Sequence, residues 1–323
     1  MASSTVHATR NTQHASFRQI VSTYGVYISL ALLLVAAAVI TPSMYSGNTL
    51  FLILRQASQL GLVAIGQTLV MLVSGLDLSV TGVIVLTSVV IAEVGNGQNS
   101  LILPGVLISL GLGVLVGLGN GWLVTKRNVP PFVATLGTLV LIRGAQLAYT
   151  KGIPSGQVPP GMGVLSASVG PFPLSFLLWV LITAVLGYIL YATPYGRRIY
   201  ALGSNREAAR LSGVAVEPLL FSAYILCSLL AVLAGIVLTG YVGYVDRYLG
   251  RGFDLDSITA AVVGGTAFTG GRGNLLGTMA GVLLVQFLSS WLLVLGLDVQ
   301  VQLIVKGLVV VAAVALYAGF ARE

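Results

Sequence analysis

Long apolar runs alternate with short polar or glycine-rich segments along most of the chain. The runs are roughly 17 to 25 residues long, the length that an α-helix needs to cross a hydrocarbon core of about 30 Å. The pattern therefore predicts an all-α polytopic membrane protein with about ten transmembrane helices. The predicted spans are residues 24–41, 51–73, 78–95, 101–124, 131–149, 173–192, 218–240, 257–270, 274–295 and 300–320.

Two of these spans open with similar segments. GLDLSVTGVIVLTS begins the third span and FDLDSITAAVVGGT begins the eighth. In a ten-span protein the third span runs outward and the eighth runs inward. This is the relation expected of two five-helix inverted repeats, so the pattern suggests a 5+5 duplication.

The longest polar interruption, residues 193–217, contains the charged segment GSNREAARLSGV. Ser204 and Glu207 have the spacing of a capping box, in which each side chain satisfies the other's free backbone N–H. Gly213 can end the helix in a left-handed conformation. We therefore predict about two turns of helix that are too short and too charged to cross a bilayer, and that lie at the inner face or project from it.

Composition and charge support the membrane prediction. Only 8% of the residues are charged and 56% are hydrophobic, whereas an ordinary soluble domain has about 25% charged residues. The first apolar run, YGVYISLALLLVAAAVI, follows Arg10 and Arg18 and is similar to a signal peptide. An uncleaved first span is favoured because many more spans follow.

The net charge of +7 predicts topology rather than nucleic-acid binding. The basic residues concentrate on one side, as the positive-inside rule requires if both termini are cytoplasmic. Residues 1–23 then form a polar cytoplasmic tail. The inner set is Lys126, Arg127, Arg197, Arg198, Arg206, Arg210, Arg272 and Arg322, and the outer set is Lys151, Arg247 and Arg251.

The residues of catalysis and metal binding are scarce. The one cysteine, Cys227, lies in an apolar run, and His7 and His14 lie in the N-terminal tail, so no disulfide framework, metal site or enzyme active site is predicted. The glycine-rich segment GGTAFTGGRGN lacks the Lys-Ser/Thr ending of a phosphate-binding loop. It is interpreted as a tight inner turn, and the chain is not expected to bind ATP by that route.

Polar side chains within spans are costly and are therefore candidates for a solute pathway. An alternative role as helix cap is favoured for Asp77, and Asp254 and Asp256 are interpreted as caps of the eighth span. Gln67 and Asn120 are divided equally between hydrogen bonds that join helices and a pathway role. The candidate pathway residues are Gln67, Thr68, Ser74, Asp77, Asn120, Thr135 and Thr138.

Three cations lie within predicted spans, namely Arg55, Arg143 and Lys306. Each falls near an outer end, where a long side chain can extend to water. An alternative is that they form a basic rim with Arg247 and Arg251 that receives acidic groups of a binding protein. No fixed charge is needed in mid-membrane, which favours an uncharged solute.

Four segments together resemble the permease subunits of bacterial ABC importers for monosaccharides such as ribose, xylose, arabinose and galactose. They occur in the family's order, and the resemblance runs from about residue 40 to the end. Ser204 and Thr81 stand where the family commonly has glycine, and the Leu-Pro ending of the longer EAA motif is not at its expected place after Gly213. The segments are VSGLDLSVTG, PFVATLGTL, GRRIYALGSNREAARLSGV and ITAAVVGGTAFTGGRGNLLGT.

The resemblance implies that residues 24–321 form one permease domain whose short inner helix is a coupling helix. That helix would be seated on a cytoplasmic ATPase subunit, with charged contacts from Arg206, Glu207 and Arg210. The alternative is a solvated basic loop that only fixes topology. The coupling residues implied are Asn205, Arg206, Glu207, Ala208, Ala209, Arg210 and Gly213.

The same resemblance implies a non-catalytic subunit in the bacterial plasma (inner) membrane. Its partners would be the ATPase that binds ATP and Mg²⁺, an extracytoplasmic sugar-binding protein, and a second permease copy, identical or similar. A self-sufficient secondary transporter or facilitator is the main alternative, because ten spans and inverted repeats fit that class too. A structural membrane subunit that moves no solute is a third.

Overall fold

The computed structural model describes residues 24–153 and 155–321. The predicted tail 1–23 and Arg322 lie outside these residues. The first described helix is Tyr24–Ile40. It is followed by η1 (Pro42–Tyr45), α2 (Gly47–Leu72), α3 (Val80–Gly95), η2 (Asn99–Leu101), α4 (Ile102–Lys126), α5 (Pro131–Thr150), η3 (Pro160–Ser166), β1 (Ser168–Val169), β2 (Phe172–Pro173), α6 (Leu174–Ala192), α7 (Pro194–Ser204), α8 (Arg206–Leu211), α9 (Val216–Val242), α10 (Phe253–Val263), α11 (Leu275–Val294) and α12 (Val299–Ala321).

The described chain is a bundle of long helices with one small hairpin. Among the described residues, six helical segments are long and apolar enough to cross a membrane: α2, α4 with η2, α5, α6, α9 and α11. The apolar stretches Tyr24–Ile40, Val80–Gly95 and Val299–Val309 are shorter. The count of ten spans is therefore not confirmed. The all-α prediction holds except for the antiparallel pair β1–β2, in which Val169 faces Phe172.

The eighth predicted span, 257–270, is wrong as a span. Helix α10 ends at Val263 after only 11 residues, which is a rise of roughly 16 Å. Gly264 and Gly265 follow it, and Gly265 has a φ of +91°, a value that L-residues with side chains rarely adopt. The apolar residues after Val263 therefore belong to a turn, as the glycine-rich pattern of 264–274 predicts.

Helix α9 forms the centre of the bundle and packs against α4, α2 and α3. Its contact with α4 is close because Gly113, Gly117 and Gly121 repeat every four residues along the facing side of α4. A Cβ atom on Gly117 would stand 2.5 Å from the Cα of Ile225 in α9. Small residues let helix backbones approach in this way in membrane proteins, and these three glycines of α4 serve that packing.

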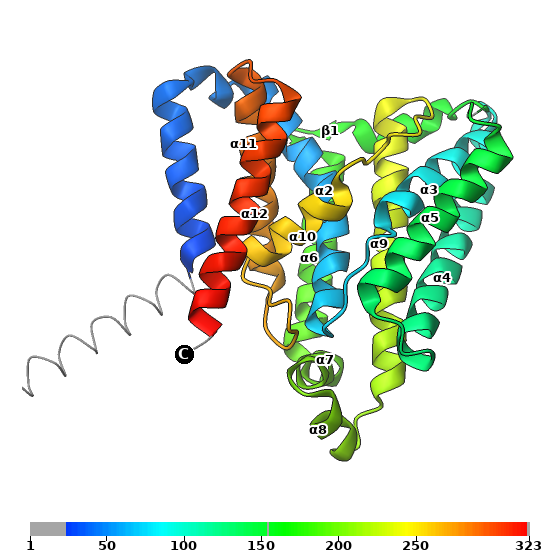
Figure 1. Ribbon diagram of the computed structural model, residues 1–323. Helices are drawn as coiled ribbons and strands as arrows, with labels where there is room; N and C mark the ends of the chain where they lie inside the picture. Colours follow the sequence, from blue (N-terminus) through cyan, green and yellow to red (C-terminus); the bar gives the residue numbers. More distant parts are fainter. Residues whose placement is uncertain (1–23, 154, 322–323) are drawn as a thin grey trace, which may run out of the picture.

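The two segments matched in the sequence are both entered through irregular backbone. Residues 73–79 separate α2 from α3, and residues 243–252 separate α9 from α10. Figure 1 shows that α3 and α10 run in opposite directions through the bundle. Packing is also reciprocal, since α3 contacts α9 and α10 contacts α2. These features agree with the inverted repeat, which stays a prediction.

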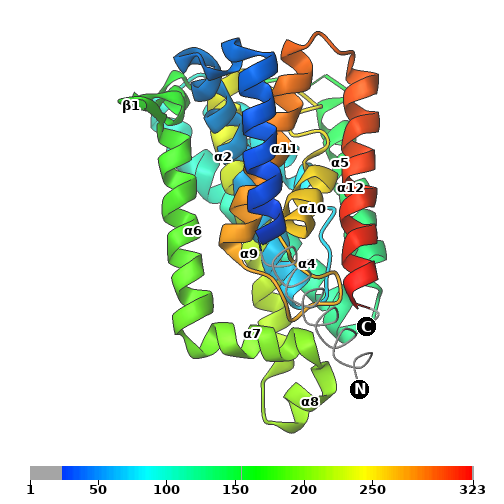
Figure 2. The ribbon, with the colours of Figure 1, turned by 90° about the vertical axis from the view of Figure 1, so that its left-hand side faces the viewer.

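Helices α7 and α8 lie beyond one end of the bundle, away from the long helices (Figure 1). Figure 2 shows α7 running across that end from the foot of α6, with α8 further out. The described part of the chain starts and finishes toward this same end (Figure 1). Helices α7 and α8 of the segment 193–217 therefore lie at the end of the bundle where the described chain starts and finishes, and their coupling role stays a prediction.

Candidate functional site

The short helix α8 forms where the sequence predicts it, but a different residue caps it. Ser204 still belongs to α7, where its hydroxyl donates to the Tyr200 carbonyl at 2.8 Å. Asn205 is the N-cap, with extended backbone and a side-chain oxygen that accepts from the Ala208 N–H at 2.9 Å. The predicted Ser204–Glu207 capping box is therefore wrong. The sequence did not reveal that α7 continues to Ser204.

The C-terminal end of α8 agrees with the prediction. Gly213 has a φ of +80°, and its N–H donates to the Arg210 carbonyl while the Val214 N–H donates to the Ala209 carbonyl, each at 3.0 Å. These two bonds make a Schellman motif, which fixes the direction in which the chain leaves the helix. Glu207 in the first turn and Arg210 in the last also complement the helix dipole.

The outward side of α8 carries both charged and apolar side chains. Arg206, Glu207, Ala208 and Arg210 are exposed, and the Leu211 side chain is 81% exposed. Ala209 is buried, so it faces the rest of the chain. The charged side chains of α8 are therefore available to a partner, which is the arrangement that a coupling role needs.

The base of this projection is fixed to the bundle through a glycine junction, which we define as Gly203, Leu72 and Gly271. The Gly271 N–H donates to the Leu72 carbonyl at 3.0 Å. Gly203 packs directly on this bond, since a Cβ there would stand 1.8 Å from the Leu72 oxygen and 2.4 Å from the Gly271 nitrogen. The C-terminal end of α7 thus contacts both the end of α2 and the α10–α11 turn.

Two tyrosines of α7 anchor this helix to the rest of the bundle. The Tyr200 hydroxyl donates to the Gly273 carbonyl at 2.8 Å, and the Tyr195 hydroxyl is 2.8 Å from that of Ser222 in α9. Burial raises the pKa of the Tyr200 phenol above its ordinary value, so the phenol keeps the proton that it donates. Ser74 joins the junction as well, donating to the Thr269 carbonyl at 2.6 Å.

A chain of buried polar side chains holds the break between α2 and α3. The Thr138 hydroxyl donates to the Asn120 Oδ1 at 2.7 Å, and the Asn120 Nδ2 donates to the Ser79 hydroxyl at 2.9 Å. Ser79 donates in turn, from its hydroxyl at 2.5 Å and its N–H at 2.8 Å, to the Asp77 Oδ1. Helices α3, α4 and α5 therefore meet at one carboxylate.

Asp77 was favoured as the N-cap of α3, and that interpretation is wrong. Ser79 occupies the N-cap position, while Asp77 lies two residues earlier and is fully buried. The Gln67 amide, oriented to satisfy both its polar atoms, donates to the Asp77 carbonyl at 3.0 Å and accepts from its N–H at 3.3 Å. The side chain and the backbone of Asp77 are thus both held from the bundle.

The remaining pathway candidates are Thr68 in α2, Ser74 in the break and Thr135 in α5. Thr68 is buried, with its hydroxyl 2.7 Å from that of Thr278 in α11. The buried Thr135 donates to the Leu76 carbonyl in the break at 3.3 Å and to Pro131 at 2.9 Å. Six of the seven candidates are thus buried or half-buried within this chain, and Ser74 alone is exposed. Their role in a pathway stays a prediction.

The cations of the predicted rim separate into two groups. Arg143, Arg247 and Arg251 line one cavity between α3 and α5, and both Arg247 and Arg251 lie over the Tyr248 ring. Arg55 instead lies between the Phe51 and Tyr241 rings and donates to the Ser166 carbonyl at 3.2 Å. Only three of the five cations therefore gather.

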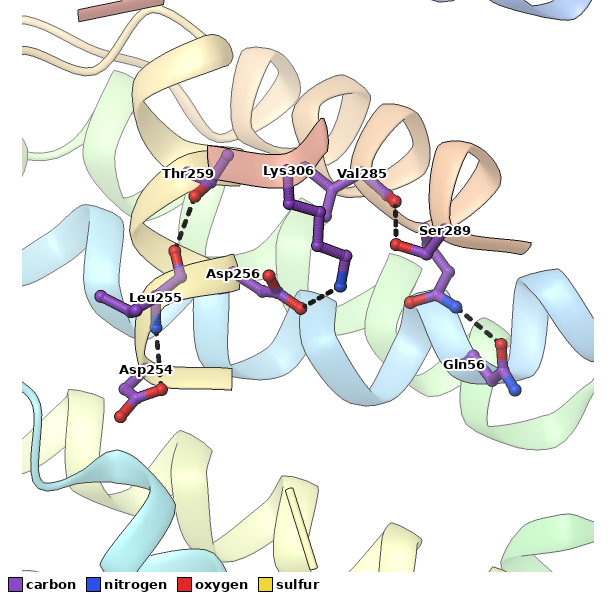
Figure 3. A network of polar contacts seen from close by, with 9 residues as sticks. Gln56, Asp254, Leu255, Asp256, Thr259, Val285, Ser289 and Lys306 are labelled. Carbon is purple, nitrogen blue, oxygen red and sulfur yellow. Dashed lines mark hydrogen bonds and ion pairs between the residues drawn. The ribbon is translucent and has the colours of Figure 1, made fainter. Parts of the chain in front are cut away.

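Lys306 does not extend to water but pairs with Asp256. Its Nζ lies 2.9 Å from the Asp256 Oδ2, joining α12 to the short helix α10 (Figure 3). The interpretation of Asp254 and Asp256 as caps is wrong, because Gly252 is the N-cap. Asp254 accepts from the Leu255 N–H at 3.0 Å, and Gln286 and Gln56 join α11 to α2 close by, at 2.6 Å.

Replacing Lys306 by methionine should lower the free energy of unfolding by about 2 kcal/mol, because it leaves the half-buried Asp256 carboxylate without its partner. The thermal midpoint of the detergent-purified protein measures this. Lys126→Met is the matched control, since the Lys126–Glu217 pair is about half exposed on both sides and water screens such pairs. Equal midpoints for the two variants would contradict the expectation.

Comparison with known proteins assigns most of the chain to one family. A family model for the permease component of the branched-chain amino acid transport system matches residues 49–314. The ribose import permease protein RbsC of Escherichia coli K12 is 38% identical over 293 residues, 89% of this chain and 91% of that protein. No solved structure matches the chain.

Other relatives carry different solutes in their names. The fructose import permease protein FrcC of Rhizobium meliloti is 36% identical over 299 residues, 90% of this chain and 83% of that protein. The autoinducer 2 import system permease protein LsrC of Photorhabdus laumondii is 35% identical over 277 residues, 85% and 83% of the two chains. The chain therefore belongs to the family of multi-pass membrane permeases that serve bacterial ABC importers of monosaccharides.

Proposed function

We propose that this chain is the translocation subunit of a binding-protein-dependent ABC importer that moves a monosaccharide of the ribose or xylose class inward across the bacterial plasma membrane. It catalyses no bond chemistry itself. ATP and Mg²⁺ bind to a cytoplasmic ATPase subunit, and an extracytoplasmic binding protein delivers the solute. A second permease copy, identical or similar, completes the pathway. The name of the ribose import permease and the coverage of both chains support this class of solute.

The observation that carries the proposal is the way α8 is mounted. Its charged outward side is free of contacts with the bundle, while the end of α7 next to it packs on the glycine junction. That junction contacts the ends of two broken helices, α2–α3 and α10. A displacement of α8 by a partner is therefore transmitted directly to the segments where the helices are interrupted, which is where transporters of this general design bind solute.

The candidate pathway residues fit this arrangement. Asp77, Asn120 and Thr138 hold the α2–α3 break, and Thr68 meets α11 beside the other broken helix. We propose that movement of the breaks exposes some of these polar side chains to the hydroxyl groups of a passing sugar. In the resting state these hydrogen bonds are formed, and the solute pathway is closed at the α2–α3 break.

Reconstitution tests the function. In proteoliposomes, uptake of a radiolabelled monosaccharide is expected only when the partner ATPase, ATP and the external binding protein are all present. The double variant Glu207→Lys/Arg210→Glu should lower this uptake at least about tenfold, since it reverses the charges that α8 offers to the ATPase. Arg127→Gln, an exposed cation at the same end, is the control. Uptake by the permease alone would instead support a facilitator.

The arginines of the opposite end give a second expectation. We propose that Arg247 and Arg251 receive acidic groups of the binding protein, because long-range attraction between opposite charges speeds docking. Arg247→Glu/Arg251→Glu should weaken docking about tenfold or more in a pull-down or surface-binding measurement at low salt. ATPase binding should be unchanged. Arg127→Glu, at the α8 end, controls for a charge reversal elsewhere on the chain, and unaltered docking by the double variant would discard the idea.

A further inference from the structure

A cavity of about 500 Å³ lies between α3 and α5, on the side of the bundle opposite α8. Thr81, Val85 and Val89 line it from one stripe of α3, over roughly 12 Å of helix. Arg143, Gln146, Leu147 and Thr150 line it from one stripe of α5, and the segment from Arg247 to Arg251 closes its remaining side. The volume is in the range of small-molecule sites.

The charged residues that line this cavity are all positive. Its lining residues include three arginines and no aspartate or glutamate. Arg143 lies seven residues before the end of α5, roughly 10 Å below the helix end, and its side chain is exposed beside the cavity. Cations on this side of the bundle also oppose the positive-inside bias. Clefts lined by one sign of charge concentrate ions of the opposite sign.

A buried hydroxyl borders the same cavity. Thr81 is 2% exposed, and its Oγ1 has no hydrogen-bond partner. In contrast, the Thr87 hydroxyl two turns later donates to the Val83 carbonyl at 2.8 Å. Gln146 is fixed nearby by its bond to the Gly82 carbonyl at 3.1 Å. The Thr81 hydroxyl is therefore a buried polar group without a partner at the edge of the cavity.

We propose that this cavity is a solute-binding site for a monosaccharide-sized polyol that carries one oxyanion group, a carboxylate or a phosphate. Arg143 binds the oxyanion, for which a guanidinium is the best-suited side chain. The Thr81 hydroxyl bonds to a hydroxyl group of the solute. The assignment of a transported solute rests on the proposed function, and it replaces the sequence-based expectation of an uncharged solute with an acidic one.

The charge of the cavity is tested by reaction of single cysteines with small charged thiol reagents. Cys227 is buried, so Cys227→Ser gives a background without a native thiol. Leu147→Cys places a thiol on the exposed cavity wall, one helical turn from Arg143. The ratio of the rates with an anionic and a cationic methanethiosulfonate should be about tenfold higher at this site than at Ser100→Cys, in an exposed outer turn. Adding Arg143→Gln should remove most of the difference.

The nature of the solute is tested by protection of the same thiol. D-ribonate should slow modification of Leu147→Cys at least about fivefold at a concentration where D-ribose has no effect, and Thr81→Val should weaken that protection several-fold. Equal rate ratios at the two cysteine sites, or equal protection by the two sugars, would overturn the proposal. So would an absence of protection by D-ribonate and by D-ribose 5-phosphate, or a failure of both reagents to reach the thiol.

A lipid phosphate is the other source of an oxyanion at this depth. Nanodiscs with and without phosphatidylglycerol separate the two cases, because a bound anionic lipid would slow modification in the first and make D-ribonate ineffective. That outcome assigns the cavity to lipid and overturns the solute site. The proposed function fails separately, if ATP-driven uptake is absent while charge preference and D-ribonate protection persist in the purified chain.

Discussion

Gly203→Ala is expected to abolish most ATP-driven uptake and to destabilise the protein. The new Cβ would stand 1.8 Å from the Leu72 oxygen and 2.4 Å from the Gly271 nitrogen, and neither backbone atom can rotate away. Helix α7 must therefore shift, or the Gly271–Leu72 hydrogen bond must break. Overpacking of this kind costs about 1 to 3 kcal/mol. We expect uptake in proteoliposomes to fall at least about tenfold, because a displaced α7 no longer transmits the movement of α8.

Gly187→Ala in α6 is the matched control, because a Cβ at that position would meet nothing within 4 Å. Alanine is the better residue in a helix interior by about 0.5 to 1 kcal/mol, so this variant should be as stable as the native chain or slightly more so. Normal coupling in Gly203→Ala, measured as uptake per ATP hydrolysed, would show that movement does not pass through the glycine junction.

The sequence predicts the long helices and the projecting loop well because both depend on local composition. The apolar runs that become α4, α6 and α9 are continuous, and the charged segment around Glu207 cannot be buried. The end of α8 is predicted because a glycine in the left-handed region is required there, whatever the rest of the chain does. These features need no knowledge of which helix lies beside which.

Helix α7 was missed although its sequence carries a signal. Pro194 is its first residue, a position that suits proline because the missing N–H has no helical partner. Ile199 and Leu202 are buried on one side, and Arg197 and Arg198 are exposed on another. Because this helix is only 11 residues long, the pattern of residues 193–217 predicted a polar loop in its place. Knowing that it reaches Ser204 would have moved the cap of α8 to Asn205.

The errors at the helix breaks have another origin. An aspartate before an apolar run looks the same in sequence whether it caps the helix or accepts hydrogen bonds from residues beside it. The donors that complete the network around Asp77 come from α4 and α5, through Asn120 and Thr138. The three-arginine cavity likewise requires α5 and the segment before α10 to be adjacent. Tertiary contacts of this kind are not encoded in any local pattern.

Asp77→Ala should be the most destabilising of the single polar substitutions. It removes the acceptor of both the Ser79 N–H and the Ser79 hydroxyl, in a site with no access to water. Leaving buried donors without an acceptor costs about 1 to 3 kcal/mol. The thermal midpoint and the denaturant midpoint of the purified permease should both fall clearly, and uptake should fall with them because the break also contacts the glycine junction.

Asp77→Asn separates geometry from charge in this network. The asparagine side chain keeps an oxygen at the position of Oδ1, so it can still accept from Ser79, and the Asn120 and Thr138 bonds need not move. We expect it to retain most of the stability and uptake that Asp77→Ala loses. If the two variants are equally impaired, the negative charge itself is required at the break. If Asp77→Ala matches the native protein in both midpoints, the hydrogen bonds that run from Thr138 to Asp77 do not hold α2 to α3. The pathway must then be closed by other contacts.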